Sequence, residues 1–520
     1  MSSGRGDELD AADSGRLSRG IPLAGDSLDK SIWGRRKLGP KYQSDSGTFI
    51  DTERCVKKAF LCDWSHTTGG AALAARGKVR AFGSTKISKE TLEEIMDVLY
   101  EFFPMLIRIF TYYSCVGVDV TKSVHGIGKL GYTLMLNDAR LDILDVDLFE
   151  DIESPSKSHT GARRMARHAR KRGEDGFDLL WTAVNSMASS KEQGTGKHKT
   201  NAATDMVRSE FMEWIVRAAT GEQPPQAMAQ NVRWLCEDLI YFLSKHEMAS
   251  LIFSNANWFR LDACYLKQMD VVLRKHELTL QSLFEVYAAA TGVGKDYTER
   301  DDLMNYEEFA YIWDDLGFTR ELTERRLSTI FALSRMLVID EHAATSAKIP
   351  MLQRLPFEGF LEAMVRLADV KALPTVAEIE SKGFVFPGEY LKSLRIEGGD
   401  ETYRAWIAGA KKLHQNGQHD SLWQRLDTLI LIIVFIVQSG VEASPGGADV
   451  LLRAAPDEKL SKREVGVYRK APKPNMLGNI DEAVEGYEFM ATQQVSKERA
   501  MKKMDRVSAE SRRSGSPSNE

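Results

Sequence analysis

The sequence has few of the features that mark several large classes of protein. Its 520 residues include only five cysteines, an odd number without C-x-x-C spacing, which argues against a disulfide framework and predicts a reducing, cytoplasmic setting. The longest uninterrupted apolar run, Leu429 to Val437, has nine residues, about half of what a bilayer-spanning helix requires. We expect this run to form a core helix, with membrane insertion as the alternative. The first twenty residues lack an apolar segment, so no secretory signal is expected.

Catalytic motifs are equally scarce. The chain contains no P-loop, no Rossmann glycine pattern, no H-E-x-x-H and no G-x-S-x-G. The ten histidines are dispersed, and His246, His276 and His414 fall in polar helical contexts where a solvated side chain is expected. Asp314 and Asp315 are adjacent, so on a helix they point about 100 degrees apart and do not form an acid/base pair. We therefore expect a protein that is not an enzyme.

The composition is that of an ordinary globular protein. Hydrophobic residues make up 43% and charged residues 28% of the chain, which is long enough for two or three domains. The net charge of -5 argues against binding nucleic acid through overall charge, so no specific nucleic-acid partner is expected.

An internal repeat organises the chain. The segment Arg208 to Ala219 matches Phe357 to Ala368 at a shift of 149 positions, with Phe211 on Phe360 and Glu213 on Glu362. Val216-Arg217 falls on Val365-Arg366 in the same alignment, and apolar residues recur at helical spacing in both segments. The two closing segments are therefore predicted to be homologous helices.

A second shift relates the opening parts of the two copies. At 177 positions, Leu106 falls on Leu283, Tyr132 on Phe309 and Asp138 on Asp315. The shift falls from 177 to 149 because the first copy carries 28 more residues, which we assign to a polar insert at about 154–200. Such an insert is expected to be a surface loop.

Helical periodicity, with no sustained strand-like alternation, predicts an all-α fold. Ser88 is the expected cap of a helix from Leu92 to Tyr113, in which Pro104 predicts a kink or a break. The predicted organisation is two helical modules joined by bridging helices, with disordered termini. Its parts are a disordered arm (1–50), a docking segment (51–87), module A (88–222), bridging helices (223–278), module B (279–372), a C-terminal helical segment (373–441) and a mostly disordered tail (442–520).

The order helix, loop, helix, helix, loop, helix in each copy resembles a pair of EF-hands. The closing pattern F-x-E-x-hydrophobic-V-R-x-A and the connector Trp258 to Leu266 resemble those of degenerate EF-hand-like repeat proteins of motile cilia, flagella and protist cytoskeletons. The resemblance covers roughly 88–372. It implies a non-catalytic scaffold or adaptor in a cilium, flagellar axoneme or cortical cytoskeleton, acting through protein-protein contacts, with tubulin or microtubule-associated proteins as candidate partners.

The predicted loops provide few calcium ligands. A calcium-binding EF-hand loop needs oxygen ligands at positions 1, 3, 5, 9 and 12 and a glycine at position 6. The frame from Tyr297 to Glu308 offers Glu299, Asp301 and Glu308, but it has Tyr297 at position 1 and Asp302 in place of the glycine. Because a hard dication needs more oxygens than these, we expect no cofactor. The alternative is a calcium-responsive regulator that binds a target helix through module B.

A basic segment lies inside the insert. Six positive charges fall within ten residues. One interpretation is a solvated loop. The alternatives are a contact for an acidic partner surface and a nuclear import signal. The candidate partner-binding residues are Arg163, Arg164, Arg167, Arg170, Lys171 and Arg172.

Overall fold

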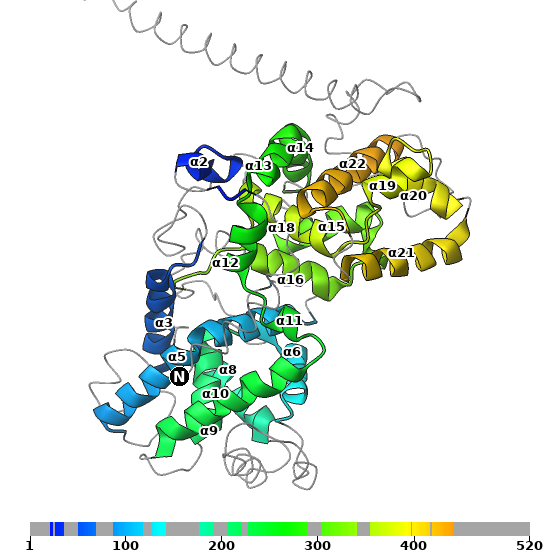
Figure 1. Ribbon diagram of the computed structural model, residues 1–520. Coiled ribbons are helices and arrows are strands. Elements are labelled where there is room, and N and C mark those ends of the chain that lie inside the picture. The colour runs from blue at the N-terminus through cyan, green and yellow to red at the C-terminus, as the bar shows by residue number, and fades with distance from the viewer. Residues whose placement is uncertain are drawn as a thin grey trace, which may run out of the picture. The chain divides into compact units, whose positions relative to one another are not determined.

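The computed structural model is mostly helical, which confirms the predicted fold class in its coarse form and adds one small sheet (Figure 1). The described residues are 21–23, 26–35, 50–68, 87–117, 124, 126–141, 176–191, 205–220, 227–288, 303–340, 354–396, 398–415 and 419–440. The predicted basic segment, most of the predicted N-terminal arm and the predicted tail lie outside these ranges. Within them, no helix combines the length and the apolar character needed to cross a membrane.

The elements before residue 265 are helices and two short strands. They are α2 (Asp26–Asp29), η1 (Ile32–Arg35), α3 (Glu53–Thr68), α5 (Lys89–Ser114), β1 (Ile127–Gly128), α6 (Lys129–Asp138), α8 (Gly176–Lys191), β2 (Asp205–Met206), α9 (Arg208–Thr220), α10 (Met228–Lys245), α11 (Ala249–Ile252), α12 (Ala256–Phe259) and the π-helix η6 (Arg260–Cys264).

The later elements of the described chain are helical. They are α13 (Lys267–Lys275), α14 (Glu277–Ala288), α15 (Tyr306–Asp315), η7 (Phe318–Arg320), α16 (Glu324–Ser334), α18 (Phe357–Val370), α19 (Val376–Ser381), α20 (Pro387–Ile396), α21 (Gly399–Gln415) and α22 (Leu422–Gly440).

The chain divides into two compact units. Unit 1 comprises Met1–Asp270, Leu303–Ala310 and Glu321–Val370. Unit 2 comprises Val271–Asp302, Tyr311–Arg320 and Lys371–Glu520.

The helix α5 is the longest described element of unit 1 and follows the predicted pattern. Ser88 is its N-cap, because the Ser88 hydroxyl accepts a hydrogen bond from the Thr91 amide at 3.2 Å. Its apolar face buries Ile95, Leu99 and Phe103 in the core of the unit. The helix continues through Pro104 without a break, so the alternative of two separate helices at this proline is wrong.

The polar insert contains a helix that was not predicted from the sequence. The structure forms α8 within 176–191, where only a surface loop was predicted. Leu180, Trp181 and Val184 are buried, and the Trp181 ring lies 4.8 Å from the ring of Tyr132 on α6. The prediction of a continuous loop is therefore wrong here, because a short apolar stripe inside a polar segment is enough to anchor one helix on the core.

The helices α5, α9 and α10 form the centre of the unit 1 core. Figure 1 shows α10 lying beside α5 and α9, and it packs against both. Trp214 on α9 is fully buried, and its indole Nε1 donates to the Tyr132 hydroxyl at 3.0 Å. Burying the indole N–H without a hydrogen-bond partner would lower the stability of the fold, and this hydrogen bond prevents that loss.

Two antiparallel contacts pair loop segments within unit 1. Ile127 on β1 pairs with Met206 on β2, and Met304 forms an isolated antiparallel bridge with Leu355. Ile127 and Met304 are 177 positions apart, and Met206 and Leu355 are 149 positions apart, which are the two shifts of the repeat. The structure therefore places the same pairing at equivalent positions of both copies.

The apolar run near the end of the described chain is a buried face of α22 in unit 2. Leu429, Ile430 and Ile432 are fully buried. The helix α20 packs closely on α22, since a Cβ added at Gly388 would lie 2.4 Å from the Phe435 ring. Glu378 on α19 accepts hydrogen bonds from the Tyr390 hydroxyl at 2.6 Å and the Trp406 indole at 2.8 Å, which ties α19 to α20 and α21.

Candidate functional site

One predicted calcium ligand, Glu308, lies at the start of α15. Its carboxylate accepts a hydrogen bond from the Asn305 amide at 2.8 Å, and the Asn305 side chain accepts one from the Glu308 amide at 2.8 Å. This reciprocal pair is a capping box, which satisfies amides at the helix N-terminus. The Glu308 side chain is buried in this arrangement.

The other two predicted ligands, Glu299 and Asp301, lie outside the described residues. Among the residues that it does describe, no group of three or more His, Cys, Asp or Glu side chains could hold a metal ion. Calcium binding by Glu299, Asp301 and Glu308 stays a prediction.

The closing helices of the two copies carry the same ion pair. Arg217 contacts Glu213 at 2.7 Å on α9, and Arg366 contacts Glu362 at 2.7 Å on α18. These are the residues that the 149-position shift aligns. A spacing of four residues places both members on one helix face, so the shared sequence pattern produces the shared contact.

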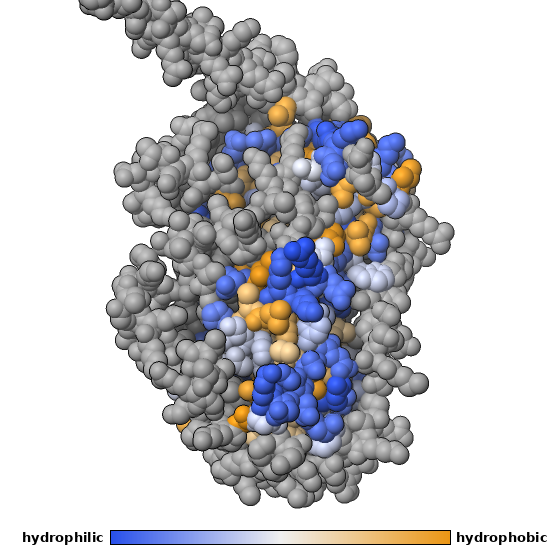
Figure 2. Space-filling view, turned by 90° about the vertical axis from the view of Figure 1, so that its left-hand side faces the viewer, coloured by the Kyte–Doolittle hydropathy of each residue, from blue (hydrophilic) through white to orange (hydrophobic). Residues whose placement is uncertain are grey.

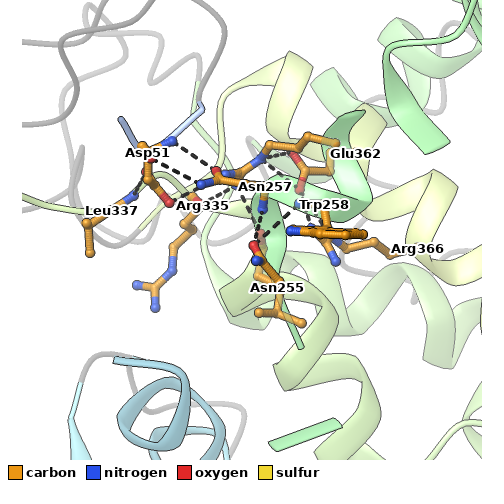
Figure 3. A network of polar contacts seen from close by, with 10 residues as sticks. Asp51, Asn255, Asn257, Trp258, Arg335, Leu337, Glu362 and Arg366 are labelled. Carbon is orange, nitrogen blue, oxygen red and sulfur yellow. Dashed lines mark hydrogen bonds and ion pairs between the residues drawn. The ribbon is translucent and has the colours of Figure 1, made fainter. Parts of the chain in front are cut away.

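Glu362 is also the centre of a buried polar network, shown in Figure 3. The Arg260 guanidinium donates through Nε to both Glu362 oxygens, at 2.9 and 3.2 Å. Both side chains of this pair are fully buried. Through Nη2, Arg260 also donates to the carbonyl oxygens of Leu333 at 3.1 Å and Arg335 at 2.8 Å, where α16 ends. Arg260 therefore joins η6, α16 and α18.

Asp51 brings the N-terminal segment into the same network. Its Oδ2 lies 3.8 Å from Nη1 of Arg260, and its backbone exchanges two hydrogen bonds with the Asn257 side chain, at 2.9 and 3.1 Å. Burial raises the pKa of Asp51, against the opposing charge of Arg260. Burial alone would lower the pKa of Arg260, but the charges of Glu362 and Asp51 outweigh this effect and raise it.

A second buried ion pair fastens α3 to α9. Arg208 binds Asp63 through two donors, with the Nη2 to Oδ1 distance at 3.2 Å, and both side chains are almost fully buried. The Thr67 hydroxyl adds a hydrogen bond to the Ser209 carbonyl at 3.1 Å. The segment 51–68 therefore contacts both α9 and the Arg260 network, all within unit 1.

An open cleft of about 180 Å³ lies beside these contacts in unit 1. Asp51, α3, α5, the start of α9, the loop before α12 and the end of α16 contribute to its walls. Three arginines, one carboxylate, two amide and three hydroxyl side chains line it together with an apolar surface. The polar residues are Arg108, Arg208, Arg335, Asp51, Asn255, Asn257, Thr111, Ser114 and Ser254.

One of the described histidines belongs to a buried pair. His276 in unit 2 is fully buried, and its Nε2 lies 2.6 Å from the Asp427 carboxylate. The expectation of a solvated His276 is therefore wrong, because its partner comes from α22, 151 residues further on. Burial tends to raise the pKa of Asp427, but the hydrogen bond and charge of His276 and the charge of Lys275 hold it below its ordinary value.

The roles of Asp51, Asp63 and Arg260 were not predicted from the sequence. Arg260 carried the clearest signal, because it and Asp262 are the two charges in the mostly apolar connector from Trp258 to Leu266. A charged residue inside an apolar stretch is buried only when it is paired. Asp51 and Asp63 had no such local signal, and only the structure brings them to their arginines.

On the face shown in Figure 2, the described apolar residues form small groups between hydrophilic ones. Exposed large apolar side chains include Leu130 and Leu179, which are the sequence neighbours of Lys129 and Asp178 in the Lys129–Asp178 ion pair. Scattered exposed apolar residues of this kind are normal for a folded protein.

No protein-family model, curated protein or solved structure matches the chain.

Proposed function

We propose that this chain is a non-catalytic scaffold or adaptor that contains two EF-hand-like modules and acts through protein-protein contacts without needing calcium. Module A consists of α5, α6, α8 and α9, and module B consists of α14, α15, α16 and α18. The observation that carries the proposal is the equivalent antiparallel pairing at Ile127–Met206 and Met304–Leu355. Paired loops between helices are the arrangement of an EF-hand pair, and they occur here at the positions that the repeat predicts.

The helix α10 supports a module that is held in one state. It packs against α5 and α9, the first and last helices of module A, and buries Val232, Leu235 and Leu239. In EF-hand proteins an apolar groove receives an amphipathic helix from a target. Here α10 supplies such a helix from the same chain. A module with this built-in occupant requires no calcium-driven opening to keep its shape.

Calcium is expected to leave the full-length protein unchanged. The Glu308 carboxylate serves as a helix cap, and replacing it by alanine should lower stability by about 1 kcal/mol with or without calcium. Glu308→Gln retains the capping box and is the matched control. Calorimetric titration of the full chain should show no saturable calcium heat. A saturable heat that Glu308→Gln abolishes would instead establish the calcium-responsive regulator.

The proposed location is a cilium, a flagellum or the cortical cytoskeleton, as the sequence resemblance implies. A tagged chain expressed in its source cell should stay in the detergent-insoluble cytoskeleton both with calcium and with chelator. Release of the chain by calcium alone would contradict a constitutive scaffold.

The basic segment is the proposed contact for the acidic surface of tubulin. Replacing Arg163, Arg164, Arg167, Arg170, Lys171 and Arg172 by serine removes six positive charges and should weaken microtubule co-sedimentation at low salt. A control variant that loses six exposed positive charges outside this segment should bind microtubules as strongly as the unsubstituted protein does. Unchanged co-sedimentation of the serine variant would exclude this segment as the contact.

A further inference from the structure

The cleft of unit 1 brings guanidinium groups from three separate elements to one place. Arg108 lies on α5, Arg208 begins α9, and Arg335 follows α16. In Figure 3 the Arg335 side chain points away from Glu362, so Arg335 joins the buried network through its carbonyl oxygen and not through its guanidinium group. Arginine presents five donors in a planar fork that matches the geometry of a carboxylate. The cleft therefore concentrates the side chain best suited to recognise such a group.

The three arginines have different surroundings. Arg208 is paired with Asp63, whereas Arg108 donates to the Phe253 carbonyl at 3.3 Å and Arg335 donates to the Val124 carbonyl. Asp51 is the one carboxylate among the residues that line the cleft. Three guanidinium groups and one carboxylate therefore lie along the walls, and guanidinium groups attract anions.

Apart from two amide and three hydroxyl side chains, the remaining wall is apolar. Val56, Ile107, Leu333, Met336 and Leu337 line the same cleft. Small-molecule sites typically combine an apolar lining with a few polar groups that fix the orientation of the ligand. A ligand that fits these walls has an anionic end and a hydrocarbon body.

We propose that this cleft binds a small organic carboxylate, with the carboxylate held by Arg108 and Arg335 and the carbon chain against Val56, Ile107 and Leu337. The cleft volume of about 180 Å³ lies below the roughly 300–1,000 Å³ of typical small-molecule sites, which favours a ligand with a short carbon chain. Butyrate is an aliphatic monocarboxylate of this kind. This inference concerns a ligand site and does not depend on the scaffold function.

The direct test is a calorimetric titration of the full chain with sodium butyrate, using sodium chloride at equal ionic strength as the reference. Saturable binding with a Kd on the order of 1 mM is expected, because so few atoms limit the affinity. The same titration with inorganic phosphate should show at least roughly tenfold weaker binding, because phosphate has no carbon body for the apolar wall. No saturable heat up to ~50 mM butyrate, or equal affinity for phosphate, would overturn the proposal.

Three variants locate the site. Arg108→Gln should weaken butyrate binding by at least roughly tenfold. Arg233→Gln removes a half-exposed arginine of α10 that does not line the cleft, and it should leave the affinity unchanged. Thr111→Glu places a carboxylate on the α5 wall and should abolish butyrate binding while the chain stays folded. Unchanged binding by both Arg108→Gln and Thr111→Glu would show that the ligand lies elsewhere.

Discussion

Replacing Glu362 by alanine is expected to lower the free energy of unfolding by about 3–5 kcal/mol, which is a large share of the stability of a typical domain. Glu362 is fully buried and holds both Arg260 and Arg366. Its removal takes away the carboxylate that lies 2.9 Å from the buried guanidinium of Arg260, whereas the carboxylate of Asp51 is more distant, at 3.8 Å. An inadequately compensated buried charge is the physical source of the loss.

Urea unfolding followed by tryptophan fluorescence measures this loss. Glu362→Gln keeps the size of the side chain and removes its charge, so it separates the electrostatic effect from the packing effect. Lys129→Ala is the matched control for an exposed pair, because Lys129 and Asp178 are both largely solvent-accessible. Its cost should stay below about 1 kcal/mol.

The double variant Arg260→Met, Glu362→Leu tests whether the uncompensated charge of Arg260 causes the loss of stability. It removes both charges and retains apolar volume, and such replacements are often neutral for a buried pair. The double variant should therefore be more stable than Glu362→Ala, although it loses the hydrogen bonds of Arg260 to the carbonyls of Leu333 and Arg335. If Glu362→Ala lowered the free energy of unfolding by no more than Lys129→Ala does, the network would not stabilise the fold as its geometry indicates.

The sequence predicted local features of this network and missed its distant members. The alignment at 149 positions matched Glu213 with Glu362 and Arg217 with Arg366. Residues four apart lie on one face of a helix, so the ion pair within each helix follows from local geometry alone. The Arg260–Glu362 contact joins residues 102 positions apart, and the hydrogen bond from the Leu337 amide to Asp51 joins residues 286 positions apart. Such contacts depend on how helices pack, which periodicity does not specify.

Helix α8 shows a second limit of sequence reasoning. Its neighbours in the insert are polar, so the average composition of the segment favoured a loop. The helix is held by a few large side chains, and the Tyr132 hydroxyl also donates to the Phe177 carbonyl at 2.8 Å. Tertiary packing therefore decided the outcome against the composition of the segment. His276 is similar, since the buried pair with Asp427 overrides its polar sequence context.

Asp238 on α10 carries the second large expected effect. Its side chain is buried, with 7% of the residue exposed, and its Oδ2 has no hydrogen-bond partner. Burial raises the pKa of Asp238 to about 7, and the neighbouring charge of Glu237 adds to this effect. Above about pH 7, the folded protein must therefore hold an ionised carboxylate in a buried position where one of its oxygens has no hydrogen-bond partner.

The sign of the resulting pH dependence follows from proton linkage. The pKa of Asp238 is higher in the folded protein than the ordinary value of 3.8, so the folded state binds its proton more tightly than the unfolded state. The stability contributed by this proton is fully present below about pH 4 and declines as the pH rises to about 7. A shift of roughly three pH units corresponds to at most about 4 kcal/mol.

Asp238→Asn removes the titrating group and should be more stable than the unsubstituted protein at pH 8, by up to about 4 kcal/mol. The two proteins should converge near pH 4, where Asp238 is protonated. Asp97→Asn, at an exposed position of α5, is the control and should leave the stability curve unchanged at every pH. Since α10 covers α5 and α9, hydrogen exchange of α10 amides in the unsubstituted protein should slow on acidification from pH 8 to pH 5, once corrected for the intrinsic exchange rate. A difference between Asp238→Asn and the unsubstituted protein that is the same at pH 4 and pH 8 would show that packing, and not ionisation, sets the stability of this helix.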